Sequence, residues 1–233
     1  MTYKLITLTA FITMPFLSTG QTYAERFFEI AANDTAAQRQ FLEKWERDQP
    51  NSGDLYMSQS AYYAQKASYE TRERRTELGT RAIAAVDKGI AQYPDRLDLL
   101  TMKQTLAHSL NRFDISTTAL LKANEYGNKM GHKWKEMGSK PLENGEAFFL
   151  QTVGDYINDI LKKDDPALFL YLKQVSVAVL QYHPKHVMSL YGLALTHEHE
   201  KQNDKAKACY EKIVQYGNDQ EKEFGRQRIA QLN

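Results

Sequence analysis

The chain has 233 residues, 42% of them hydrophobic and 25% charged, which excludes a disordered polypeptide and provides enough apolar residues for a sizeable core. Its net charge of +1 gives no concentrated positive field, so neither nucleic acid nor an acidic membrane surface is an expected partner. The single cysteine excludes an internal disulfide. Alternation of apolar and polar residues is almost lacking, and this predicts an all-α protein.

The first twenty residues have the three parts of an export signal. Lys4 supplies the positive charge, Leu5 to Leu17 form the apolar stretch, and Ser18-Thr19-Gly20 offers a small-residue cleavage site. A second cleavage site follows Ala24. The apolar stretch has thirteen residues, whereas a membrane-spanning helix needs about 20. We therefore expect residues 1–20 to be a signal peptide rather than a permanent membrane anchor.

The mature chain, residues 21–233, is expected to be an exported protein, periplasmic or secreted, without stable membrane insertion. Loss of Lys4 leaves 29 basic and 29 acidic residues, so its net charge is zero. The one basic cluster alternates with glutamates three and four residues away, which is typical of a solvated helix face. Its arginines are Arg72, Arg74, Arg75 and Arg81.

Amphipathic patterns predict five helices in the first half of the mature chain, at about 35–48, 54–70, 71–92, 95–110 and 113–123. The second is rich in tyrosine, with Tyr56, Tyr62, Tyr63 and Tyr69. These rings either pack between helices or form a platform for a ligand. The third has the clearest apolar stripe, formed by Ala82, Ala85, Val86, Gly89 and Ile90.

The pattern lapses between Gly127 and Asn144, where glycines, lysines and Pro141 predict an irregular loop. Loops of this length inside a compact array are uncommon and often functional. Trp134 lies within it. Because a large apolar ring is costly to expose, the preferred interpretation is that Trp134 anchors the loop, with a functional role as the alternative.

Helices resume at about 145–162, and Asp164-Asp165-Pro166 is a helix-start signal for the next one. A regular pair of helices follows on either side of a turn at 201–204. Cys209 lies beside the apolar stripe of the second member and is expected in the core rather than as a reactive thiol. A polar helix at 219–231 is predicted to close the stack, since the last core face would otherwise meet water.

Four prolines recur at intervals of 44, 47 and 43 residues: Pro50, Pro94, Pro141 and Pro184. A near-constant period between amphipathic segments is typical of stacked helical repeats. Three of these prolines lie between two predicted helices, whereas Pro141 closes the long loop and only mimics the period. The prediction is a single array of about ten helices.

The segment from Leu190 to Tyr210 resembles a tetratricopeptide repeat, with Leu193-Ala194 at the helix crossing and Ala206 in the second helix. The same pattern returns at Leu100, Ala107, Asn111, Phe113, Leu120 and Ala123. With the export signal, the Lys133-Trp134 loop and the stretch from Tyr182 to Val187, the chain resembles exported bacterial tetratricopeptide proteins with no assigned activity. The resemblance implies a right-handed superhelical array of antiparallel helix pairs with a concave face.

Some tetratricopeptide domains hold chaperone C-termini with a clamp of lysines and asparagines along the concave face. The comparable positions here carry other residues, so that clamp is absent: Met57, Ala61, Thr101, Thr105, Tyr191 and Leu195.

Histidines suggest a metal site, because four of them occur close together: His183, His186, His197 and His199. However, His197 and His199 are two residues apart and point to different sides of a helix. The zinc-protease spacing of two histidines four residues apart is also lacking. We therefore expect no metal and no cofactor.

The sequence has no glycine-rich phosphate loop and no serine-elbow motif. The leading hypothesis is a non-enzymatic scaffold that binds a protein or peptide along the concave face. The alternatives are a module that captures a small or carbohydrate-like ligand through the tyrosine-rich helix, and an enzyme whose site leaves no motif. A closed apolar pocket around Tyr62, Tyr63 and Tyr69 would favour the capture module. Helical phase selects three candidate binding residues on inner helices: Tyr191, His199 and His108.

Overall fold

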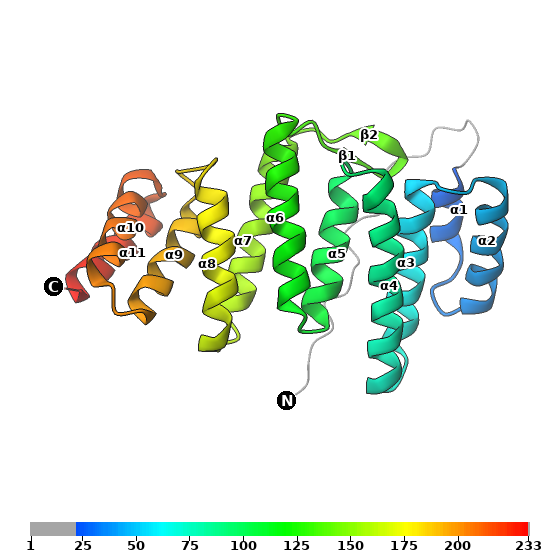
Figure 1. Cartoon of the computed structure of the whole chain (residues 1–233), viewed down its shortest axis with the longest axis horizontal. Helices are drawn as coiled ribbons and strands as arrows, with labels where there is room; N and C mark the ends of the chain where they lie inside the picture. The colour runs from blue at the N-terminus through cyan, green and yellow to red at the C-terminus, as the bar shows by residue number, and fades with distance from the viewer. Residues whose placement is uncertain (1–21, 233) are drawn as a thin grey trace.

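The computed structural model describes residues 22–232 (Figure 1). The predicted signal peptide lies outside the described residues. The second cleavage site, after Ala24, falls within the first described helix, where Ala24 is buried. The described residues form eleven α-helices, two short 3-10 helices and one small hairpin, so the all-α prediction is confirmed.

The elements follow in chain order: α1 (Tyr23–Glu29), α2 (Thr35–Asp48), α3 (Gly53–Ser68), α4 (Arg72–Gln92), α5 (Leu97–Ser109), α6 (Phe113–Lys129), β1 (Lys135–Glu136), η1 (Met137–Ser139), β2 (Lys140–Pro141), α7 (Gly145–Leu161), η2 (Pro166–Leu168), α8 (Phe169–Leu180), α9 (Val187–His199), α10 (Asn203–Tyr216) and α11 (Asp219–Gln231). Ten of the helices match the ten that the sequence predicts, and α1 is additional.

Local capping explains where several helices begin. Thr22 and Asn218 each form a capping box, with a glutamate three residues later, at the starts of α1 and α11. The carboxylate of Asp165 accepts a hydrogen bond from the Ala167 amide at 3.0 Å, and Pro166 is the first residue of η2. The start signal at Asp165-Pro166 is thus confirmed, although the chain first makes a 3-10 turn before α8.

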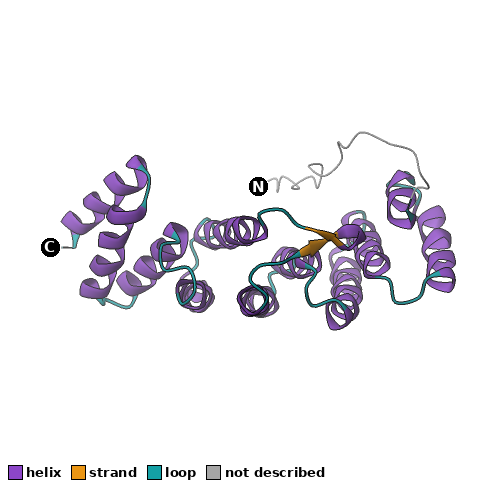
Figure 2. Cartoon of the chain, turned by 90° about the horizontal axis from the view of Figure 1, so that it is seen from above, coloured by secondary structure: helices purple, strands orange, loops and turns teal. Residues whose placement is uncertain are grey.

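The helices stand side by side in one elongated row, with α1 and α2 at one end and α10 and α11 at the other (Figure 1). Seen from above, the same row is a long, narrow body (Figure 2). Most helices that follow one another in the chain pack together, most extensively α3 with α4, α5 with α6, and α9 with α10, whereas α6 packs mainly against α5 and α8, and α7 mainly against α9. The molecule is therefore a helical array, while a right-handed superhelical twist stays a prediction.

The core is divided into four apolar clusters distributed along the row: one among α1 to α3, one among α3 to α5, one from α5 to α8, and one among α9 to α11. Each helix pair therefore buries its apolar face against its neighbours, as in repeat proteins. Where two neighbouring helices cross closely, only a small residue fits between them. At Gly192 in α9, an added methyl group would lie 2.7 Å from the Ser176 hydroxyl of α8.

The irregular segment is shorter than predicted, because α6 continues to Lys129. Beyond it the chain folds into the antiparallel hairpin of β1 and β2, which η1 connects. Trp134 precedes the hairpin and is only 1% exposed, within the cluster from α5 to α8. The interpretation of Trp134 as an anchor is confirmed.

A buried arginine fixes the far end of the hairpin. Arg96 is 1% exposed and pairs with Asp98 at 2.6 Å and with Asp54 at 2.8 Å. The same Asp54 carboxylate accepts a hydrogen bond from the Gly138 amide at 2.9 Å. Gly138 has φ of +75°, which suits glycine. These contacts join α3, α5 and η1, so the hairpin reaches back over the ends of earlier helices (Figure 1).

Candidate functional site

An open pocket of about 750 Å³ lies between the hairpin and the start of α7. Its walls come from the segment before the hairpin, from β2 and from the first turns of α7. The lining residues are Gly131, His132, Lys133, Trp134, Lys135, Pro141, Leu142, Asn144, Gly145, Glu146, Ala147 and Leu150. The pocket therefore exists because the chain is irregular at this point.

A second pocket of about 460 Å³ continues along α7. It shares Ala147 and Leu150 with the first, and His186 and Met188 at the start of α9 border it. The rest of its lining comes from α7: Gln151, Gly154, Asp155 and Asn158. Because the two pockets share residues on α7, they adjoin each other, and we call them together the α7 groove.

The amphipathic character of α7 produces this groove. One face of the helix is buried in the core, with Phe149, Val153 and Ile157 essentially inaccessible. The other face carries the short side chain of Ala147 and has no side chain at Gly154. A methyl group added at Gly154 would have Met188 as its nearest neighbour, at an ordinary van der Waals distance of 3.5 Å. Small residues on the floor thus leave space between the hairpin and α9.

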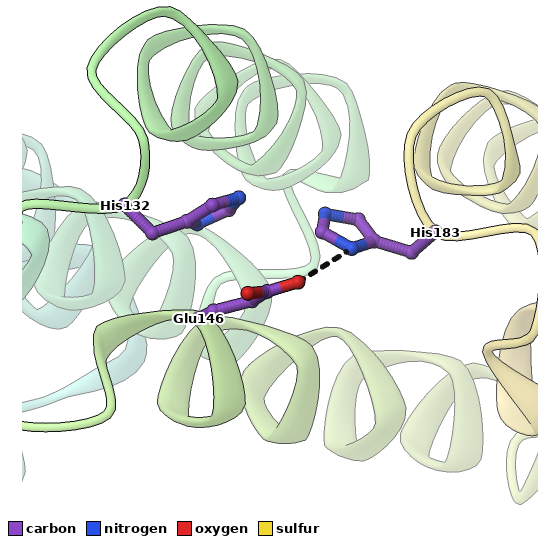
Figure 3. Close-up of side chains that lie close together, drawn as sticks. All are labelled: His132, Glu146 and His183. Carbon is purple, nitrogen blue, oxygen red and sulfur yellow. Dashed lines mark ion pairs between the residues drawn. The ribbon is translucent and has the colours of Figure 1, made fainter.

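Three ionisable side chains meet at the hairpin end of the groove: His132, Glu146 and His183 (Figure 3). One potential ligand atom from each lies within 4.8 Å of the others. The Nδ1 atom of His183 is 3.1 Å from Oε1 of Glu146. The two imidazole rings lie edge to face, with centroids 5.3 Å apart and an interplanar angle of 62°.

Different local features position the three side chains. His132 follows the end of α6 with φ of +55°, and its amide donates a hydrogen bond to the Gly127 carbonyl at 2.7 Å. Glu146 is in the first turn of α7. His183 follows α8, and its amide donates to the Val179 carbonyl at 2.8 Å. Gly145 leaves room for the approach, since an added methyl group would lie 2.9 Å from the His132 carbonyl oxygen.

Several nitrogens in this cluster are buried without a hydrogen-bond partner among the described residues. They are both ring nitrogens of His132 and Nε2 of His183. Burial lowers the pKa of His132, the Glu146 carboxylate opposes this shift, and His183 adds to it. His132 is therefore mainly neutral at pH 7, with a free lone pair. Two imidazoles and a carboxylate form a donor set that transition metals accept.

Sequence reasoning missed this cluster because its members are far apart in the chain. It considered histidines that are close in sequence, whereas His183 meets partners from the end of α6 and the start of α7. His186, His197 and His199 are outside the cluster. The available signal was His132, two residues before Trp134 in the irregular segment.

The three residues that helical phase selects do not come together. The ring of His108 packs against Phe113 and Tyr156, with centroids 5.2 and 5.7 Å away, and burial lowers its pKa. Tyr191 packs edge-on against Phe224 of the capping helix, and burial raises its pKa. His199 is exposed and stacks on Phe169 at 4.7 Å. None of these three residues is among those that line the two parts of the α7 groove.

The tyrosine-rich helix mainly serves packing. Tyr56 and Tyr62 are buried and Tyr63 is partly buried, whereas Tyr69 is 70% exposed. The α7 groove does not include these tyrosines. The arginines of α4 are exposed, and Arg81 pairs with Glu77 at 2.7 Å, so the solvated-face interpretation is confirmed.

Comparison with protein-family models and with curated proteins gave no match for this chain. Within residues 22–232, none of the helices combines the length and the apolar character that a bilayer crossing requires.

Proposed function

We propose that the protein is an exported interaction scaffold of the tetratricopeptide type, without catalytic activity, which binds a segment of a partner protein in the α7 groove. The observation that carries the proposal is that two adjoining pockets follow one helix in the middle of an elongated array. Helical-repeat proteins commonly bind partners along extended surfaces of this kind.

The chemistry of the groove suits a peptide in an extended conformation. Gln151 and Asn158 offer amide groups that can both donate and accept hydrogen bonds, as peptide backbones require. Leu142 and Leu150 are partly exposed and add apolar surface at the hairpin end, where a side chain of the partner would be buried. The groove therefore provides both backbone recognition and an apolar contact.

The test fills the groove without changing the core. Ala147 is exposed and lines both parts of the groove, so Ala147→Trp places a large ring in the binding path. The matched control is Ala91→Trp, at an exposed alanine of α4 away from the groove. Partners are first captured from the exported fraction with the wild-type protein, and their affinity is then measured with purified components.

We expect Ala147→Trp to weaken partner binding at least tenfold, while Ala91→Trp leaves it unchanged. Circular dichroism should show equal helix content for both variants. Equal binding by Ala147→Trp and the wild type would place the partner on another surface. Failure of the wild type to capture any protein would shift support to the ligand-capture alternative.

A further inference from the structure

We propose that His132, Glu146 and His183 bind a divalent transition-metal ion, with zinc as the best fit. The site would connect the end of α6, the start of α7 and the end of α8 (Figure 3). It does not depend on the interaction function, because it rests on a separate set of side chains.

The distances are close to those of a zinc site. Ligands about 2.1 Å from a tetrahedral ion lie about 3.4 Å from one another. The nearest oxygen of Glu146 and Nδ1 of His183 are already 3.1 Å apart, and all three ligand atoms lie within 4.8 Å. The Glu146 side chain is 56% exposed, so it is free to adjust toward an ion.

Burial gives a second, independent reason. The His183 side chain is only 9% exposed, and its Nε2 atom has no hydrogen-bond partner among the described residues. Both ring nitrogens of His132 are also buried and have no hydrogen-bond partner among the described residues. Buried polar atoms are normally satisfied, and exceptions in native proteins call for an explanation such as an ion. An ion held by Nδ1 of His183 and the Glu146 carboxylate would satisfy one of the unpartnered nitrogens of His132.

The donor types indicate which metal fits. Two nitrogens and one carboxylate oxygen suit zinc and neighbouring transition metals, whereas calcium and magnesium prefer oxygen ligands alone. Three protein ligands leave a fourth tetrahedral position. His132 and Glu146 both line the wide part of the α7 groove, so water has access to that position.

The three ligands come from the segment after α6, the first turn of α7 and the segment after α8, and this has a mechanical consequence. An ion would hold the end of α6 and the end of α8 against the start of α7, next to the buried Trp134. Because a metal that binds only the folded state stabilises it, zinc would raise the unfolding temperature.

The experiment measures zinc binding directly. The purified protein is treated with a chelator, dialysed and titrated with zinc chloride against a chromophoric zinc indicator. The variants are His132→Gln, Glu146→Gln and His183→Gln. The matched controls are His199→Gln and Glu143→Gln, which change an exposed histidine and an exposed glutamate outside the cluster.

We expect one zinc ion per chain in the wild type and in both controls. Either histidine variant should bind at least a hundredfold more weakly, and Glu146→Gln at least tenfold more weakly. Zinc should raise the unfolding temperature of the wild type and of His199→Gln but not that of His183→Gln. Glu146 is exposed, so its variant tests the site even if a histidine variant fails to fold.

Two results would overturn the site. The first is the lack of stoichiometric zinc binding by the chelator-treated wild type. The second is unchanged affinity in Glu146→Gln together with the histidine variants, which would place zinc on other residues. Loss of zinc binding with normal partner capture would leave the scaffold function intact, and Ala147→Trp tests that function without removing a metal ligand.

Discussion

The C-terminal helices α9 to α11 and the middle segment from α6 to α7 bury apolar surface in different ways. In the C-terminal region, consecutive helices are joined by short turns and share one cluster around Tyr210 and Ile213. In the middle, fifteen residues separate α6 from α7, and distant contacts of Trp134 and Gly138 fix their path. Regular stacking follows from local patterns, whereas the irregular segment needs specific long-range contacts and in return creates the α7 groove.

The largest expected effect comes from removing the anchor of the irregular segment. Trp134→Ala should lower the free energy of unfolding by about 3–5 kcal/mol, because a fully buried aromatic side chain is lost and a cavity remains. Urea unfolding measures this change. Hydrogen exchange should show faster exchange at residues 130–144 and little change in α9 to α11. Trp134→Phe, which keeps an aromatic ring, should cost less. A loss below about 1 kcal/mol for the alanine variant would mean that the segment is held by other contacts.

A second test compares two arginines in equivalent positions. Arg96 pairs with Asp98 just before α5, and Arg112 pairs with Asp114 just before α6. Arg96 is buried and Arg112 is 53% exposed. Arg96→Met should cost about 3 kcal/mol, because it leaves the carboxylate of Asp54 facing an apolar side chain.

Arg112→Met should cost less than about 0.5 kcal/mol, because exposed ion pairs contribute little. Thermal and urea unfolding measure both variants. Similar costs for the two would contradict the view that the hairpin depends on buried, specific contacts. Hydrogen exchange at the Gly138 amide is the direct reporter of that dependence.

The border between the two regions should respond to pH. His186 precedes α9, and burial lowers its pKa to about 4, with His183 adding to the shift. The unfolded state binds a proton at a pKa of about 6.5, so between pH 6.5 and 4 it holds more protons than the folded state. The contribution of His186 to folding stability is therefore fully present above pH 6.5 and is lost as the pH falls toward 4.

The expected loss from His186 is on the order of 2 kcal/mol after allowance for its partial exposure. The lowered pKa values of His108 and His132 act in the same direction. Urea unfolding at pH 7 and at pH 4.5 measures the difference. His186→Asn should reduce it, whereas His199→Gln, at an exposed position, should not. An unchanged pH dependence in His186→Asn would assign the effect to other groups.

The smallest expected effect lies in the regular C-terminal region. Arg228 of α11 pairs with Glu198 of α9, and the Tyr210 hydroxyl donates a hydrogen bond to the same carboxylate. Arg228→Ala should cost about 1 kcal/mol and should mainly increase hydrogen exchange in α11. The control is Arg226→Ala, which removes an exposed pair with Glu223 and should change stability by less than about 0.5 kcal/mol. A cost above about 3 kcal/mol would show that the cap, too, depends on a specific contact.

Most helix positions could be predicted, and the misses have physical causes. The bounds of α2 agree with its predicted range, and Cys209 is buried as expected, with its pKa raised by burial. The seven residues of α1 are too few for a clear stripe, and strands of two residues show no alternation. His108, which helical phase places off the core stripe, is partly buried and packs against Phe113 and Tyr156 from neighbouring helices.

By itself, the sequence determined that this is an array of paired helices with a capped C-terminal end, because the spacing of apolar residues and local capping act over a few residues. Only the tertiary structure decided what lies in the middle of the array. His132 and His183 are 51 positions apart, yet both lie close to Glu146. Arg96 becomes buried only because Asp54 and Asp98 converge on it. Such contacts depend on how successive helices pack, and no local pattern in the chain specifies them.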